Sequence, residues 1–326
     1  MICPNCNCEM MDDALICPEC NARVMQQMHE ERVAIATQRV KDVYNSSFSS
    51  TPFLIYAICI SIIAAGGVAV LISELIAMGF LGIFSMAFSA IPVVFAALSA
   101  VAAWKLYSNK DNELLESNVK KLGLYPAFNQ VIGIILTVLM ALITVLWFIM
   151  TPYITSLVEN AEFKASFYEQ LAANGGEQVI ESVDMIFEFG VGLIMWIIAI
   201  VFLVLTVYLI FYTVMYARVK HYYNMVSEVA GGADYNSKRK PPVVLLCVVG
   251  AFALLGVGDM FLGGSVFSGL TSLGEGVYLL MSGIVLSDFD RKLKKAKNDL
   301  ETEKKELIDV IVATNAQAAK MNNGTY

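Results

Sequence analysis

Six long apolar blocks constrain this chain more than any other feature of its sequence. They cover residues 53–73, 78–104, 128–150, 189–216, 243–262 and 266–286. A helix needs roughly 20 apolar residues to cross a hydrocarbon core, and a backbone in lipid must satisfy its own N–H and C=O groups. None of the blocks shows the period-2 alternation of a barrel strand, and 57% of all residues are hydrophobic. The sequence therefore predicts an all-α polytopic membrane protein with six transmembrane helices, embedded in the lipid bilayer of the cell membrane.

The basic residues divide unevenly between the segments that join these blocks. Of the 22 Lys and Arg residues, only Lys164 falls between the third and fourth blocks. All others lie before the first block, after the second, after the fourth or after the sixth. Lys and Arg accumulate in cytoplasmic loops, so six spans with both termini in the cytoplasm are expected. The predicted domains are a head at 1–24, a juxtamembrane helix and linker at 25–52, a transmembrane domain at 53–287 and a basic helical tail at 288–326.

The head holds two Cys-Pro-X-Cys knuckles. Cys3 and Cys6 form the first, and Cys17 and Cys20 form the second. No secretory signal precedes the first apolar block, so we expect the head to stay in the cytosol. A reducing cytosol keeps thiols free, which favours metal binding over disulfides for cysteines this close together. Four thiolates at such spacing form closed tetrahedral zinc sites, and we expect one structural zinc per chain at Cys3, Cys6, Cys17 and Cys20.

The same stretch resembles the short bacterial zinc-ribbon module, in which Gly follows each Cys-Pro-X-Cys knuckle. Asn7 and Asn21 replace both glycines here, and Asn tolerates the left-handed backbone better than other non-glycine residues. The resemblance covers about residues 1–24 and implies a small N-terminal β-hairpin zinc ribbon. Cys8 lacks the two-residue gap from Cys6 that lets both sulfurs of a knuckle reach one metal, so we expect it to be a spare thiol.

A closed four-cysteine site leaves no position for a substrate, so the head is predicted to be a rigid binding platform. Residues 10–22 contain three acids and no Lys or Arg, and they lack the basic footprint that nucleic-acid binding requires. We therefore expect the head to bind a protein partner or another part of the same assembly. His29 lies on a helix predicted over residues 23–44, and because four cysteines are already present we expect it to be a solvated surface residue.

The tail combines apolar residues at spacings of three and four with lysines and acids. The apolar positions are Leu286, Phe289, Leu293, Ala296, Leu300, Leu307, Val310 and Thr314. This weak heptad, interrupted at Glu303, is typical of a coiled coil with another copy of the chain or of packing against the head. A single juxtamembrane helix whose lysines face anionic lipid fits the pattern equally well.

Residues 151–188, between the third and fourth blocks, form a long and acidic outer segment. The apolar spacing predicts two short amphipathic helices hinged at Gly175 and Gly176. A vestibule that collects cations is one interpretation. We favour the other, in which the helices extend the third and fourth spans beyond the membrane.

Two acids lie inside predicted spans, where ionisable residues are costly and are treated as functional candidates. Asp259 lies near the outer end of the fifth span, and Glu275 lies near the middle of the sixth. Glu275 is a candidate proton or cation site. Alternatively, it is a protonated carboxyl that bonds across the helix hairpin. Ser268, Ser272 and Gly276 form a small-xxx-small face beside it, which permits close helix packing.

No enzyme signature is present: there is no Walker loop, dinucleotide fingerprint, HExxH or Gly-X-Ser-X-Gly motif. The sequence predicts a membrane scaffold or regulator rather than an enzyme. Its cytosolic zinc ribbon would dock a protein partner or another part of the same assembly, and the ribbon or the C-terminal helix would mediate any homo-oligomer. The alternative is a small transporter or channel that uses Glu275, with the ribbon in gating or assembly.

Overall fold

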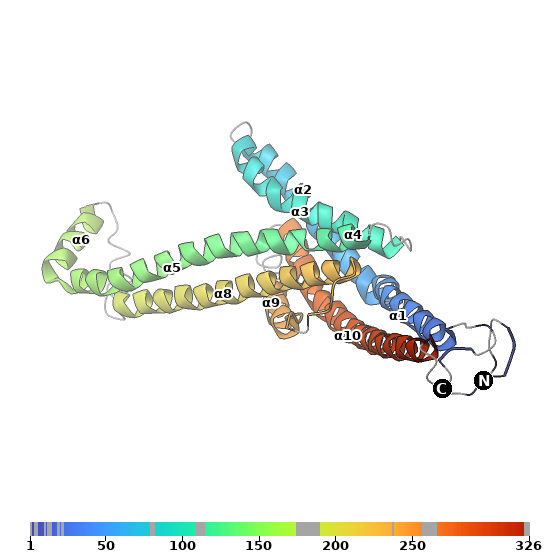
Figure 1. Cartoon of the computed structure of the whole chain (residues 1–326). Helices are drawn as coiled ribbons and strands as arrows, with labels where there is room; N and C mark the ends of the chain where they lie inside the picture. The colour runs from blue at the N-terminus through green and yellow to red at the C-terminus, as the bar shows by residue number, and fades with distance from the viewer. Residues whose placement is uncertain are drawn as a thin grey trace. The chain divides into compact units, whose positions relative to one another are not determined.

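The described part of the chain is built from α-helices. The computed structural model describes residues 2, 6–9, 11, 15–17, 20, 23–78, 82–108, 115–173, 190–236, 238–255 and 266–322. The helices are α1 (Val24–Phe48), α2 (Thr51–Met78), α3 (Gly82–Ser108), α4 (Leu115–Leu122), α5 (Leu124–Glu159), α6 (Ala161–Ala173), α8 (Val191–Ala230), α9 (Val243–Leu255) and α10 (Val266–Asn322) (Figure 1). The predicted all-α class is confirmed. In place of a β-hairpin, the described head residues form one isolated antiparallel bridge, between Ile2 and Glu9.

Five helical stretches are long and apolar enough to cross a membrane. They are Thr51–Ser73, Ala90–Ser108, Leu115–Leu157, Gly192–Ala230 and Gly269–Ala316. Each overlaps one predicted span. The sixth prediction, at residues 243–262, begins with the 13-residue apolar helix α9, and its residues 256–262 lie outside the described part. The described residues therefore define a membrane protein with five candidate spans where the sequence predicts six.

Three helices are much longer than the membrane is thick. Helix α5 has 36 residues, α8 has 40 and α10 has 57. At about 1.5 Å per residue, α10 measures roughly 85 Å, nearly three times the thickness of a hydrocarbon core of about 30 Å. Part of each helix must therefore extend beyond the bilayer. The sixth predicted span and the tail are one continuous helix.

The start of the acidic outer segment follows from the length of α5. This helix continues to Glu159, and α6 begins at Ala161 after a break at Asn160. The Asn160 side chain accepts a hydrogen bond from the backbone N–H of Glu162 at 2.8 Å and so caps the new helix. The beginning of the segment thus extends the third span, as favoured above. The predicted hinge at residues 175–176 lies outside the described residues.

One compact unit comprises residues 1–125 and 218–326. In it, α2 packs on α3 and α10, and α10 also packs on α9 and α1. Buried tyrosines fill its centre. The Tyr223 hydroxyl donates to the Tyr56 hydroxyl at 3.2 Å, and the rings of Tyr56 and Tyr278 lie 5.0 Å apart. The ring of Tyr125 meets Tyr278 edge-on at 5.7 Å, which joins segments that are far apart in the sequence.

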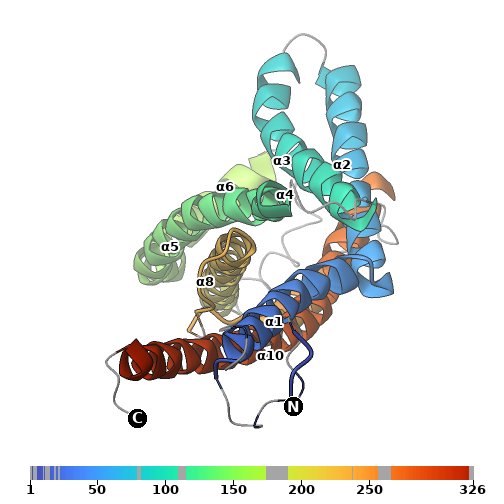
Figure 2. The same ribbon diagram turned by 45° about the vertical axis from the view of Figure 1, so that its right-hand side comes forward.

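Helices α1 and α10 of this unit run antiparallel, side by side (Figure 2). We call this pair the stalk. At one end, the Phe289 ring stacks on Phe48 with centroids 5.6 Å apart and meets Tyr44 edge-on at 5.0 Å. The Tyr44 hydroxyl donates to the carbonyl of Val226 at 2.8 Å. The heptad residues of the tail from Phe289 to Leu300 are buried. The tail therefore packs against the helix that follows the head and is not an isolated juxtamembrane helix.

The prediction that His29 is a solvated surface residue is wrong. Only 8% of its surface is exposed. It shares the buried face of α1 with Ala36, Val40 and Tyr44, and α10 covers that face. A burial that depends on α10 could not be seen in the local sequence around His29.

The other compact unit, residues 126–217, contains most of α5 and α8. The two helices lie side by side (Figure 1) along a seam of threonines. The hydroxyls of Thr144 and Thr206 are 2.9 Å apart, and the Trp147 indole donates to the carbonyl of Met195 at 3.1 Å. The outer faces are apolar and exposed, with Leu142 64% exposed. Contiguous apolar surface of this kind marks a site of contact, and a lipid bilayer explains it for helices of this length.

Candidate functional site

The thiols of the head converge. The Cys8 sulfur lies 3.1 Å from that of Cys17 and 3.3 Å from that of Cys6, and the sulfurs of Cys6 and Cys17 are 3.6 Å apart. The Cys20 thiol also interacts with Cys6. Cys3 lies outside the described residues. These four closely placed cysteines, Cys6, Cys8, Cys17 and Cys20, could bind a metal ion.

A sharp turn at Asn7 brings Cys6 and Cys8 together. Asn7 has a φ of 59°, and it is the one non-glycine residue with positive φ in the described part. The left-handed turn expected for this Asn is confirmed, whereas Asn21 lies outside the described residues. The turn places the thiols on either side of Asn7 within 3.3 Å of each other. The Cys8 sulfur therefore lies inside the cluster, although the spacing of the knuckle predicts it to be a spare thiol.

The spacing of the sulfurs fits a tetrahedral metal ion. Four thiolates about 2.3 Å from a zinc ion lie about 3.8 Å from one another, and the sulfurs here are 3.1 to 3.6 Å apart. Disulfide sulfurs would lie about 2.0 Å apart, so none of these sulfur contacts is a disulfide bond. Small outward movements of the side chains would admit the ion.

The electrostatics of the cluster disfavour a free thiolate. The backbone N–H of Cys8 lowers the pKa of the Cys6 thiol, but the Cys8 side chain, partial desolvation and the thiols of Cys20 and Cys17 raise it. The pKa of Cys6 therefore lies well above its ordinary value. Crowded thiols resist the build-up of negative charge, whereas a divalent cation binds thiolates and deprotonates them. The cluster thus suits a metal ion better than a lone reactive thiolate.

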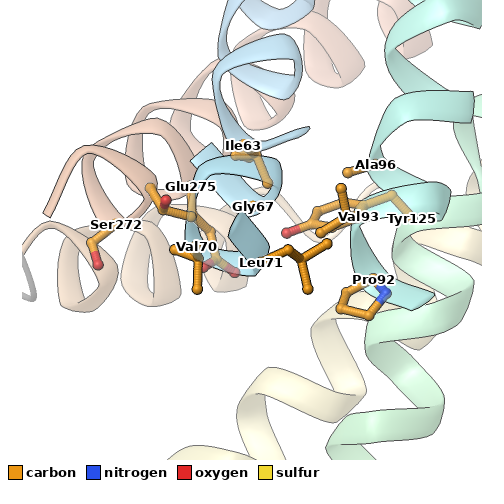
Figure 3. Close-up of a pocket in the computed structure, with 11 residues that line it drawn as sticks. Ile63, Gly67, Val70, Leu71, Pro92, Val93, Ala96, Tyr125, Ser272 and Glu275 are labelled. Carbon is orange, nitrogen blue, oxygen red and sulfur yellow. The ribbon is translucent and has the colours of Figure 1, made fainter. Parts of the chain in front are cut away.

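A cavity of about 400 Å³ lies among α2, α3 and α10, beside Glu275 (Figure 3). Thr271, Ser272 and Glu275 of α10 supply polar groups to its lining, together with Tyr125 from the start of α5. The rest of the lining is apolar or small and consists of Ile63, Gly67, Val70, Leu71, Pro92, Val93 and Ala96. Figure 3 shows the residues of α2 between Glu275 on one side and those of α3 on the other. Glu275, which belongs to a candidate span, therefore lines a mostly apolar cavity.

Of the other predicted intramembrane features, Asp259 and the side chain of Ser268 lie outside the described residues. Ser272 and Gly276 face different neighbours: Ser272 lines the cavity, whereas Gly276 packs against α9. The predicted close helix packing is therefore present at Gly276, but these two residues do not form one face toward a single partner.

The sequence reasoning missed Tyr125 and Tyr278 next to Glu275. Each lies at the edge of or within an apolar block, where an aromatic residue is usual, so neither stands out by composition. A single sequence contains no signal that pairs Tyr125 with Tyr278 across the fold. Their proximity becomes visible only when α10 is placed against the start of α5 within the same compact unit.

Comparisons with known proteins find no relative of this chain. No protein-family model matches it, and searches of curated proteins and of solved structures found no match. The described helices, five of which are long and apolar enough to span a membrane, and the cysteine cluster define the class: a helical membrane protein with a cysteine cluster in its head. Any functional argument must come from the sites themselves.

Proposed function

We propose that this chain is a multi-pass membrane scaffold or regulator whose cytosolic head binds one zinc ion and docks a protein partner or another part of the same assembly. The stalk is the observation that carries the proposal. It holds the helix that follows the head against the tail (Figure 1). The head is therefore attached to a rigid helical support instead of a free linker, as a docking module requires.

The stalk also supports the proposed topology. Helices α1 and α10 can pack together only if both ends of the chain lie on one side of the membrane, which requires an even number of crossings. Five candidate spans are an odd number, so we propose that α9 and the residues after it complete a sixth. The concentration of Lys and Arg on the side of the stalk favours the cytoplasm for both termini.

The zinc would have a structural role in the head. Cys6, Cys17 and Cys20 would hold it together with Cys8 or Cys3, and a closed set of four thiolates leaves no position for a substrate. So short a head buries too little apolar surface to fold alone, and metal binding would supply the folding free energy. The resemblance to a zinc ribbon implies the same role.

Copurification of the full chain from its native cells in mild detergent tests the docking role. We expect a protein bound in fixed proportion to the native chain, and we expect it to be lost with Cys17→Ser, because Cys17 is a fully buried member of the cluster. Cys247→Ser is the matched control, since it removes an exposed thiol from α9 and leaves the head intact. A partner retained equally by both variants would contradict docking through the head.

One observation favours transport as a second candidate function. The cavity beside Glu275 combines a carboxyl, two hydroxyl side chains of α10 and an apolar wall inside a candidate span. An ion or proton path through a membrane protein is commonly marked by an acid in such a position. Under this alternative, the head would act in gating or assembly.

Ion flux into proteoliposomes separates the two candidates. A scaffold predicts the same background flux of protons and monovalent cations for the native chain and for Glu275→Gln. The matched control is Ser272→Ala, which changes the cavity lining but keeps the carboxyl. A flux well above that of empty liposomes that disappears with Glu275→Gln and persists with Ser272→Ala would favour the transporter and contradict the scaffold.

A further inference from the structure

The stalk contains a polar group in an otherwise apolar seam. On α10 the buried positions Phe289 and Ala296 lie seven residues apart, and the next position at that interval is Glu303. An apolar residue is expected there in a heptad. Opposite this interruption, α1 buries His29. Among the described residues, His29 is the one buried histidine, and it lies opposite Glu303, the acid that interrupts the heptad.

Glu306 completes the group. His29, Glu303 and Glu306 each have one potential metal-ligating atom that lies within 4.8 Å of those of the other two residues. The Nδ1 atom of His29 is 3.9 Å from a carboxylate oxygen of Glu306, which is too long for a hydrogen bond. Glu306 is half-exposed and its side chain can move. Three groups of metal-ligating type thus meet at one point between two helices.

Two atoms of this group are buried and have no hydrogen-bond partner among the residues that the structure describes. They are Nδ1 of His29 and one carboxylate oxygen, Oε2, of Glu303. More than nine-tenths of His29 is buried. Leaving buried polar atoms unpaired is costly, and native structures rarely do so without a reason. A ligand that binds both atoms removes the cost.

We propose that His29, Glu303 and Glu306 bind a divalent transition-metal ion of the Zn²⁺ type. Imidazole nitrogen selects zinc, iron, copper and nickel over calcium and magnesium. Nitrogen and oxygen ligands about 2.0 to 2.2 Å from a tetrahedral zinc ion lie about 3.4 Å from one another, so the three ligand atoms, now within 4.8 Å of one another, would move closer together. The Glu306 side chain is half-exposed and can rotate to supply part of this movement. Three protein ligands leave one position for water, unlike the four ligands of a closed structural zinc site.

A metal ion at this point would link α1 to α10, close to where α1 leaves the head. It would fasten the head end of α1 to the tail when metal is abundant and loosen that end when metal is scarce, whereas the contacts of Tyr44 and Phe48 with Phe289 hold the other end of the stalk in both cases. This role goes beyond docking and does not depend on the zinc of the cysteine cluster, so the two sites can be tested separately.

The test uses the full chain in detergent with Cys17→Ser, which removes the metal of the head. This protein is dialysed against buffered free Zn²⁺, and bound metal is measured by mass spectrometry. We expect one equivalent of zinc. Adding His29→Gln or Glu303→Gln should weaken its binding by at least about a hundredfold, because loss even of an outer-shell partner costs about 10 to 100-fold. His221→Gln and Glu301→Gln are the matched controls, since both residues are exposed, and they should leave binding unchanged.

Amide hydrogen exchange provides a second measurement. Zn²⁺ should slow exchange in the first turns of α1 in the Cys17→Ser chain and have no such effect once Glu303→Gln is added. Co²⁺ bound at the stalk should show visible bands without the thiolate charge-transfer bands of a cysteine site. Absence of a zinc equivalent in the Cys17→Ser chain, or an equivalent that survives both His29→Gln and Glu303→Gln, would overturn the proposal, and neither result would bear on docking by the head.

Discussion

Cys17→Ser is expected to remove one zinc ion per chain from the purified protein and to unfold the head. Cys17 is fully buried and its sulfur lies within 3.6 Å of two other thiols. Loss of an outer-shell group already weakens zinc binding by about 10 to 100-fold, so loss of a ligand should weaken it by more than about a hundredfold. Metal content by mass spectrometry and hydrogen exchange of residues 1–24 measure the two effects. Cys247→Ser should retain the full metal content of the native chain.

The identity of the fourth ligand can be read from the same measurement. The Cys8 sulfur is within 3.3 Å of those of both Cys6 and Cys17, so we expect Cys8→Ser to lose the zinc and Cys3→Ser to keep it. The ligand set expected from the knuckle spacing gives the reverse result. If native protein, purified without chelators, carries no metal that depends on Cys17, the zinc assignment itself is contradicted.

The membrane helices could be predicted because the cost of placing a residue in lipid depends mainly on that residue and its immediate neighbours. Residues 53–73 were assigned from composition alone, and Thr51–Ser73 is a candidate span in the structure. The end of α10 could not be assigned in this way. The helical tail was expected, but its contact with α1 pairs segments from the two ends of the chain, and a single sequence contains no signal for that pairing.

The cysteine cluster was also predictable in part. The two knuckles predict a cluster of cysteines that could bind a metal ion, and Asn7 turns the chain as expected, because Asn tolerates the left-handed conformation. The position of Cys8 depends on the direction in which the turned chain continues. The interruption of the heptad at Glu303 is likewise visible in the sequence. That His29 lies beside Glu303 is not, because it depends on how α1 packs on α10.

The close contact between α9 and α10 at Gly276 gives the second large expected effect. Gly276→Ala should destabilise the protein by about 1 to 3 kcal/mol, the usual cost of overpacking a well-packed core. A Cβ on Gly276 would lie 2.6 Å from the Leu254 side chain and 3.0 Å from the backbone oxygen of Gly250. Leu254 can rotate away, but the backbone oxygen can move only if α9 moves from α10. Unfolding by a denaturing detergent in mixed micelles, followed by circular dichroism, measures the change.

Gly283→Ala is the matched control on the same helix and against the same neighbour. A Cβ there would meet the nearest atoms of α9 at 3.7 to 3.8 Å, which is ordinary van der Waals contact. Alanine in place of glycine inside a helix contributes about 0.5 to 1 kcal/mol through backbone entropy and propensity, so this variant should be slightly more stable than the native chain. The two substitutions are chemically identical and should act with opposite signs. Equal shifts in the same direction would mean that α9 and α10 do not cross as closely at Gly276 as the structure places them.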